Sequence, residues 1–328
     1  MAKRCARYCL HMLVISVAFV APGVDAQSSQ KMPRVGWLGM DSTMQATRIV
    51  AFKKGLSDLG YVDGKNILIE SRWAEGRFDR LPLLAAELVA AHVDVIVTAS
   101  PAGVRAAQAA TKTIPIVMIA HEPVRMGFID SLSRPGGNVT GIAFQDTELS
   151  TKRLDLFRQA VPGLSKLAIL WNGVEGTDAK GVQAIEDAAK AMGLQVLSLE
   201  VNESRDFAIQ LVAAKAWGAQ GLVEMSSPFI TFNRKIFLDL LKTYKLPATC
   251  EMRMYVAEGC LMTYSADLNA MFYREAHYVD RILKGANPGE LAIEQPREFE
   301  FVINDNTAQA LGLTIPTSLR MQATEVIR

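Results

Sequence analysis

Two loops in the first half of the sequence carry side chains suited to binding or chemistry. Ser100-Pro101 follows an apolar, β-branched run at 93–99, and His121-Glu122-Pro123 follows a second apolar run, Ile114–Ala120. Runs of this length and composition are typical of strands that are buried on both faces. Between them, Ser100 suits the N-cap of a helix and Pro101 its first position. The segment therefore predicts a βαβ unit whose two loops open at one sheet edge, where α/β sheets bind ligands.

The chemistry predicted at this edge is the binding of a charged small molecule. The helix that starts at Ser100 directs free N–H groups and a positive dipole end toward the edge, which suits a carboxylate. Glu122 suits an ammonium group. A purely structural role is also open to each residue, because Ser100 can act as an ordinary N-cap and Glu122 can bridge two lobes or face solvent.

Known catalytic motifs do not occur in the sequence. His121-Glu122 resembles the start of the zinc motif HExxH, but position 125 is arginine and Pro123 would break the required helix. Dinucleotide-binding, P-loop and nucleophile-elbow patterns are also missing. We therefore expect a binding protein rather than an enzyme, with no catalytic residues, no metal and no cofactor.

Residues 1–26 have the features of a secretory signal peptide. Lys3, Arg4 and Arg7 precede an apolar stretch, Leu10–Val20, that is too short to span a bilayer, and small residues near Ala26 offer a cleavage site. The alternative is a buried N-terminal helix or a retained anchor. Export predicts a periplasmic location.

The net charge of the mature chain limits the partners that we expect, and its cysteines leave a disulfide open. Loss of residues 1–26 changes the formal net charge from +1 to −1 and leaves no basic cluster, so nucleic acid is not an expected partner. Cys250 and Cys260 are then the remaining cysteines. In an oxidising compartment they could form a disulfide, or they could be two buried thiols.

Strand and helix patterns alternate along the mature chain in two successive series, which predicts an α/β fold with two doubly wound parallel-sheet lobes. Strands of the first series are expected at 34–39, 66–73, 93–99, 114–120 and 138–144. Those of the second series are expected at 166–171, 195–201, 221–225, 246–250 and 260–264, with a last strand at 297–303.

The polar and aromatic residues that end these strands are the predicted ligand-binding residues. Trp171 could stack on a planar ligand or be a core tryptophan, and Asn172 could bind a ligand or form a turn. Tyr264 and Gln145 could contact ligand or pack a crossing between the lobes. The full predicted set is Asp41, Ser42, Ser100, Pro101, Ala102, His121, Glu122, Gln145, Trp171, Asn172, Ser226, Ser227 and Tyr264.

Several long motifs occur in an order that resembles one family. They are KKGLSDLGYVDGKNILIE at 53–70, IPIV at 114–117, EPVRMGFIDSLSRPGGNVTG at 122–141, and YVDRILKGANP with EFEFVINDNTAQALGLTIP in the tail at 278–316. This combination resembles the solute-binding proteins of ABC importers with the type 1 periplasmic-binding fold, in a branch whose ligands are mostly unassigned and include aromatic amino acids. One departure is Glu122-Pro123-Val124, where relatives usually have Asp-Pro-Val.

The resemblance implies two lobes joined by a three-crossing hinge, with a ligand in the cleft and closure about the hinge. The expected boundaries are residues 32–143 plus 266–299 for lobe 1 and residues 144–265 plus 300–328 for lobe 2. The resemblance further implies a monomer that captures a small solute, such as an amino acid, and delivers it to an ABC permease in the inner membrane. The alternative function is a ligand-binding sensory subunit that docks on a membrane receptor.

Overall fold

The computed structural model describes residues 32–328, apart from residues 44, 145, 174–178 and 226. The predicted signal peptide lies outside the described residues. Within them, no helix is long and apolar enough to cross a membrane, and no cluster of three or more His, Cys, Asp or Glu side chains could hold a metal ion.

The first sheet contains five parallel strands in the order β2-β1-β3-β4-β5. Its strands are β1 (Arg34–Gly39), β2 (Leu68–Trp73), β3 (Val95–Thr98), β4 (Ile116–His121) and β5 (Val139–Phe144). Strands β3 and β5 are buried throughout and β4 is buried up to His121, as their continuous apolar runs predict. This sheet and its helices are called lobe 1 below.

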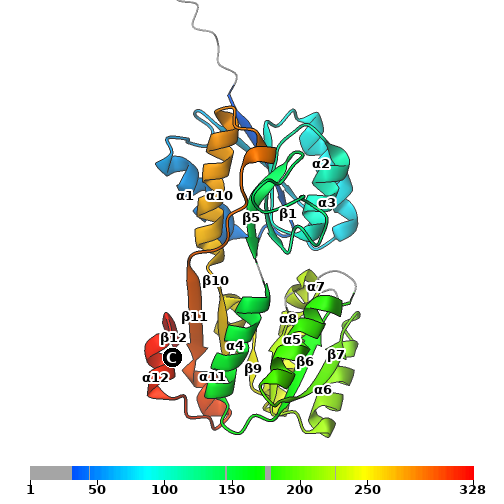
Figure 1. Cartoon of the computed structure of the whole chain (residues 1–328), viewed down its shortest axis with the longest axis vertical. Helices are drawn as coiled ribbons and strands as arrows, with labels where there is room; N and C mark the ends of the chain where they lie inside the picture. The colour runs from blue at the N-terminus through cyan, green and yellow to red at the C-terminus, as the bar shows by residue number, and fades with distance from the viewer. Residues whose placement is uncertain (1–31, 44, 145, 174–178, 226) are drawn as a thin grey trace, which may run out of the picture. The chain divides into compact units, whose positions relative to one another are not determined.

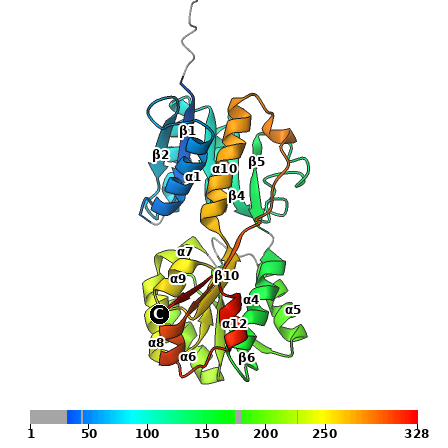
Figure 2. The same ribbon diagram turned by 90° about the vertical axis from the view of Figure 1, so that its left-hand side faces the viewer.

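Helices cover both faces of this sheet (Figure 1). One face packs against α2 (Leu81–Ala90) and α3 (Pro101–Ala110), and the other against α1 (Ala46–Asp58) and α10 (Leu268–Leu283). Helices α1 and α10 lie side by side although they are far apart in the sequence (Figure 2). Gly55 permits this approach, because a Cβ there would lie 2.4 Å from the carbonyl oxygen of Tyr273.

The second sheet contains seven strands in the order β12-β11-β10-β9-β8-β6-β7. Strands β10 and β11 pair antiparallel and the other pairs are parallel. The strands are β6 (Lys166–Trp171), β7 (Gln195–Glu200), β8 (Gly221–Glu224), β9 (Ala248–Thr249), β10 (Met262–Ala266), β11 (Phe299–Asn304) and β12 (Glu325–Ile327). This sheet and its helices are called lobe 2 below.

Two helical layers also cover the second sheet. One layer holds α4 (Asp146–Ala160), α5 (Ala179–Ala191), α11 (Asp305–Ala310) and α12 (Thr317–Gln322). The other holds α6 (Asp206–Trp217), α7 (Pro228–Phe232), α8 (Arg234–Tyr244) and α9 (Arg253–Ala257). Short 3-10 turns occur at Phe78–Arg80 and Pro288–Glu290. The sequence predicts a short helix at 128–133, but the structure has a turn at 123–127 followed by bends and irregular backbone at 128–133.

The chain passes between the two sheets three times: after β5, after β10 and before β11. The second passage places α10 against the first sheet, and the third returns the chain to the second sheet. Cys250 and Cys260 form a disulfide beside β9 and β10, which decides between the two alternatives left open by the sequence.

Candidate ligand-binding site

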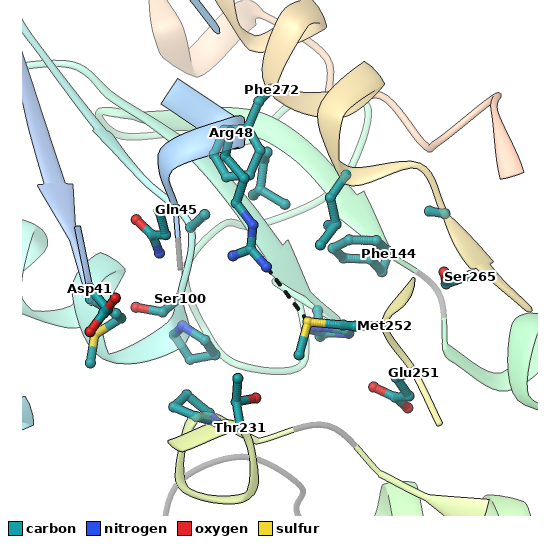
Figure 3. Close-up of a pocket in the computed structure, with 18 of the residues that line it drawn as sticks. Asp41, Gln45, Arg48, Ser100, Phe144, Thr231, Glu251, Met252, Ser265 and Phe272 are labelled. Atoms are coloured by element: carbon teal, nitrogen blue, oxygen red, sulfur yellow. Dashed lines mark hydrogen bonds between the residues drawn. The ribbon is translucent and has the colours of Figure 1, made fainter. Parts of the chain in front are cut away.

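A cavity lies where elements of the two lobes meet, lined from lobe 1 by the ends of β1, β4 and β5 and the starts of α1, α3 and α10 (Figure 3). Lobe 2 contributes α4, α7 and the segment after β9. The space open to the centre of a water molecule is about 160 Å³, roughly ten times what one water needs. The location matches the sheet edge at which α/β folds bind ligands.

Apolar and aromatic side chains form most of the cavity wall, with a few polar groups between them. This combination is typical of small-molecule sites, in which apolar surface supplies affinity and a few polar groups fix orientation. The apolar lining residues are Met40, Ala99, Pro101, Ile119, Phe144, Leu149, Pro228, Phe232, Met252, Ala266, Leu268 and Phe272. The polar ones are Asp41, Gln45, Arg48, Ser100, His121, Arg153, Thr231, Glu251 and Ser265.

Arg48, in the first turn of α1, is a cation without an ion-pair partner among the described residues. Its guanidinium lies 5.9 Å from the centre of the Phe272 ring, and Nη2 lies 3.6 Å from Sδ of Met252 (Figure 3). Burial lowers the pKa of Arg48 below its ordinary value, although the Tyr255 hydroxyl opposes this shift. Arg48 is half-buried, and a partly desolvated cation without a carboxylate partner is costly. Arg48 is therefore ready to bind an anionic group of a ligand.

Lobe 2 contributes a carboxylate, Glu251, that is already held in an ion pair. Nη1 of Arg153, on α4, donates to Oε1 of Glu251 at 2.9 Å, and Nε donates to the carbonyl oxygen of Tyr264 at 3.0 Å. The Arg153 side chain is only 6% exposed and that of Glu251 13%. The pair therefore orients Glu251 at the cavity wall and leaves its second oxygen for another donor.

Behind this pair lies a second, fully buried carboxyl group, that of Glu224 at the end of β8. Its Oε2 accepts the backbone N–H of Glu251 at 3.1 Å, and its Oε1 has no hydrogen-bond partner in the described structure. Burial, followed by repulsion from Glu251, raises the pKa of Glu224 to about 8. Glu224 is therefore protonated at neutral pH, and the cluster carries the single negative charge of Glu251 opposite Arg153.

Tyr255 and Thr231 complete the polar wall of lobe 2. Their hydroxyl groups lie 3.0 Å apart, and Thr231 Oγ1 also donates to the carbonyl oxygen of Ser227 at 2.8 Å. Burial and the nearby carboxyl group of Glu224 raise the pKa of Tyr255. Tyr255 is thus a neutral hydroxyl that fixes Thr231, which lines the cavity.

Four of the predicted residues line the cavity: Asp41, Ser100, Pro101 and His121. Ser100 is the N-cap of α3, as predicted, because its Oγ accepts the N–H of Gly103 at 3.0 Å. The His121 ring stacks on that of Phe144, with 4.6 Å between their centres.

Seven other predicted residues are not part of the cavity wall: Ser42, Ala102, Glu122, Trp171, Asn172, Ser227 and Tyr264. Ser42 is exposed in a turn, Ala102 packs on the lobe 1 core, and Glu122 follows β4 with φ +40°. Gln145 and Ser226 lie outside the described residues. The predicted ligand contacts of these nine residues remain predictions.

Four of these seven residues make contacts within the second sheet and its surroundings. Trp171 Nε1 donates to Ser198 Oγ at 2.9 Å, and its ring packs on the core. Asn172 Nδ2 donates to the carbonyl oxygen of Val201 at 2.7 Å. Ser227 is the N-cap of α7, and the Tyr264 ring stacks on Phe299 at 5.9 Å.

Sequence reasoning missed three charged residues of the cavity, Arg48, Arg153 and Glu251, and the neighbouring Gln45. Gln45 is the N-cap of α1 and Arg48 lies in its first turn, whereas Arg153 comes from the middle of α4. Glu251 follows a strand of only two residues. One available signal was the three-residue spacing of Gln45 and Arg48, which places both on one face of α1 at the sheet edge.

Comparison with known proteins shows the family. Residues 40–327 match the model of the family described as ABC transporter substrate binding protein. The chain belongs to this family. It is 28% identical over 263 residues to a protein named "Tyrosine-binding protein" from Clostridioides difficile (strain R20291), which covers 80% of this chain and 75% of the relative.

Solved structures show the same fold. An ABC domain from Streptococcus pneumonia in complex with L-Trp has a TM-score of 0.83 at 23% identity and covers 90% of this chain and 99% of its own. A conserved domain protein from Vibrio cholerae also scores 0.83, at 25% identity, with coverage of 90% and 100%. This substrate-binding protein therefore has the two-lobed α/β architecture of type 1 periplasmic-binding folds, as predicted.

Proposed function

We propose that this substrate-binding protein is exported, binds an aromatic amino acid as a zwitterion, and delivers it to an ABC permease of the inner membrane. Arg48 binds the ligand carboxylate and Glu251 the ammonium group, while the aromatic side chain lies among the apolar residues of the cavity wall. The observation that carries this proposal is the desolvated guanidinium of Arg48, which has no ion-pair partner in the described structure.

Two further observations support the choice of ligand. Phe144, Phe232 and Phe272 line the cavity, and aromatic rings stack favourably on an aromatic solute. The similar proteins include one named for tyrosine binding and one solved with L-Trp. These names, together with a cation, Arg48, on lobe 1 and a carboxylate, Glu251, on lobe 2, favour a zwitterionic aromatic amino acid over a sugar.

The two lobes make closure part of the proposed mechanism. Arg48 belongs to lobe 1 and Glu251 to lobe 2, so a zwitterion gains both charge contacts only when the lobes approach. We keep the lobe boundaries expected from the sequence as part of this proposal, with residues 32–143 plus 266–299 in lobe 1 and residues 144–265 plus 300–328 in lobe 2. The hinge then consists of the three passages of the chain between the sheets, and the closed form is what the permease recognises.

Export agrees with the disulfide between Cys250 and Cys260, because such bonds persist in oxidising compartments such as the periplasm. We propose that residues 1–26 are removed there and that the mature protein acts as a monomer. Its partners are then the solute and the permease.

The test is isothermal titration of the mature chain with L-tyrosine, L-tryptophan and L-phenylalanine. The matched controls are tyramine, which lacks the carboxylate, and 3-(4-hydroxyphenyl)propionate, which lacks the ammonium group. We expect at least one aromatic amino acid to bind and both truncated compounds to bind about 10-fold or more weakly, because each loses a charge-assisted contact. Absence of binding by all three amino acids, or equal binding of tyramine and tyrosine, would refute the proposal.

A further inference from the structure

We propose that Phe232 sets the length of side chain that the ligand cavity accepts, because its ring closes the cavity off from a second, outer cavity while resting on Gly76 of the other lobe. This inference rests on the proposed function of the inner cavity. It assigns a specificity-determining role to one residue of α7.

The outer cavity adjoins the ligand cavity at the Phe232 ring. Its volume is about 290 Å³, and lobe 1 contributes Gly76 and Phe78 to its wall. Lobe 2 contributes Phe229, two asparagines that follow strands (Asn172 and Asn202) and one that follows α7 (Asn233). Phe232 is the residue that lines both cavities. Its half-buried ring is therefore a partition between them.

The Phe232 ring packs on Gly76 of lobe 1. A Cβ at Gly76 would lie 2.9 Å from Cε1 of Phe232 and 3.1 Å from Cζ, so the ring packs directly on the backbone of this loop. The Gly76 N–H donates to the carbonyl oxygen of Met40 at 3.0 Å, and Met40 lines the ligand cavity. The loop on which the ring packs is thus hydrogen-bonded to a residue in the lobe 1 wall of the ligand cavity.

The outer cavity is a preformed space whose amide groups are held by neighbours. Asn172 Nδ2 donates to the carbonyl oxygen of Val201 at 2.7 Å, and Asn202 Nδ2 donates to Glu200 at 2.8 Å. Asn233 Nδ2 donates to the carbonyl oxygen of Phe229 at 2.9 Å. Because these side chains are fixed, removal of the Phe232 ring should join the two cavities rather than collapse them.

The first experiment compares Phe232→Ala with Phe229→Ala. Phe229 is the matched control because it lies on the same helix, lines only the outer cavity and stacks on Phe207 at 5.8 Å. Each variant is titrated with O-benzyl-L-tyrosine and with the aromatic amino acid that the wild-type chain binds best. We expect F232A to shift the ratio of the two dissociation constants toward the longer ligand by about 10-fold or more, and F229A to leave it unchanged. An equal ratio in F232A and wild type would overturn the inference.

The second experiment tests the contact between Phe232 and Gly76 without removing the ring. Gly76→Ala introduces the clashing Cβ, and Gly64→Ala is its control, because Gly64 has a similar φ of +79° against +76° but open space around its Cβ. We expect G76A to bind the aromatic amino acid more weakly than G64A does. In the F232A background, where the ring is missing, we expect G76A to cause no further loss of affinity relative to F232A alone. Equal affinities of G76A and G64A would contradict the proposed contact.

The wild-type titration separates the two proposals. If no aromatic amino acid binds to the wild-type chain, the proposed function fails and the role of Phe232 in it fails too. If wild type binds but F232A and F229A show the same ligand ratio, only the role of Phe232 is refuted. Thermal unfolding of each variant without ligand checks that the substituted chain is folded.

Discussion

Replacement of Arg48 by methionine should have opposite effects on ligand affinity and on stability. In the unliganded chain the guanidinium is desolvated, with Phe272 and Met252 as neighbours and no ion-pair partner among the described residues. Methionine keeps much of the side-chain volume and can pack against the same neighbours. The substitution therefore removes a half-buried charge in the absence of ligand, and it removes the proposed anchor for the ligand carboxylate.

The two effects can be estimated separately. Loss of one partner of a buried, hydrogen-bonded charge pair costs about 2–5 kcal/mol, so a middle value of about 3 kcal/mol raises the dissociation constant roughly 150-fold. In the empty chain, relief of desolvation raises the free energy of unfolding, and loss of the cation–π contact with Phe272 offsets about 0.5–1 kcal/mol of that gain. We expect a net change between zero and about +2 kcal/mol.

Isothermal titration and urea unfolding of the same preparation measure both quantities. Arg105→Met is the matched control, because the Arg105 guanidinium also lies over a phenylalanine ring, Phe128, at 5.3 Å, but outside the cavity. R105M should leave affinity unchanged and lose a little stability. Unchanged ligand affinity in R48M would refute the proposed role of Arg48. If R48M lost more free energy of unfolding than R105M, the Arg48 guanidinium would not destabilise the chain in the absence of ligand.

Three further predictions concern groups behind or beside the cavity. Because burial and Glu251 raise the pKa of Glu224 to about 8 from an ordinary 4.5, its contribution to stability is complete below pH 4.5 and is lost as the pH rises through 8. Urea unfolding at pH 5, 7 and 8.5 should therefore show a loss on the order of 3 kcal/mol in wild type and a smaller loss in E224Q. Glu275→Met should raise the free energy of unfolding at pH 7 by about 1–3 kcal/mol, because both carboxyl oxygens of this buried residue have no partner in the described structure; a loss in the same urea assay would contradict this. Reduction of the disulfide between Cys250 and Cys260, ten residues apart, should lower the free energy of unfolding by about 3 kcal/mol. An unchanged urea midpoint in dithiothreitol would count against this value.

The strand positions and the sheet edge were within reach of sequence reasoning because buried strands have a strong local signal. Residues 93–99 and 114–120 correspond to β3 (Val95–Thr98) and β4 (Ile116–His121), and Ser100 caps α3. Continuous apolar runs followed by a cap or a proline determine both the strand and where it stops. Residues placed directly after such runs, among them Ser100 and His121, therefore lie at the cavity.

Residues whose position depends on a distant element had no such signal. Trp171 ends its strand as predicted, but side chains alternate between the two faces of a sheet, and its ring packs on the core with Nε1 on Ser198 of β7. Glu251 follows a two-residue strand, β9, that exists because β8 and β10 flank it. Its orientation depends on Arg153, 98 residues earlier. Long-range pairing of this kind is not visible in local patterns.

The charges of the site also indicate why a ligand should favour lobe closure. Glu251 already has a cationic partner in Arg153 on its own lobe, whereas Arg48 on the other lobe has none among the described residues. In the proposed mechanism, a ligand ammonium at Glu251 adds to an existing pair, while a ligand carboxylate at Arg48 relieves a partly desolvated charge and gains more. We therefore expect the carboxylate contact to dominate binding to lobe 1 alone. We expect the contact with Glu251 to stabilise mainly the closed arrangement, so that an acid without an ammonium group binds more weakly and with less closure than the amino acid.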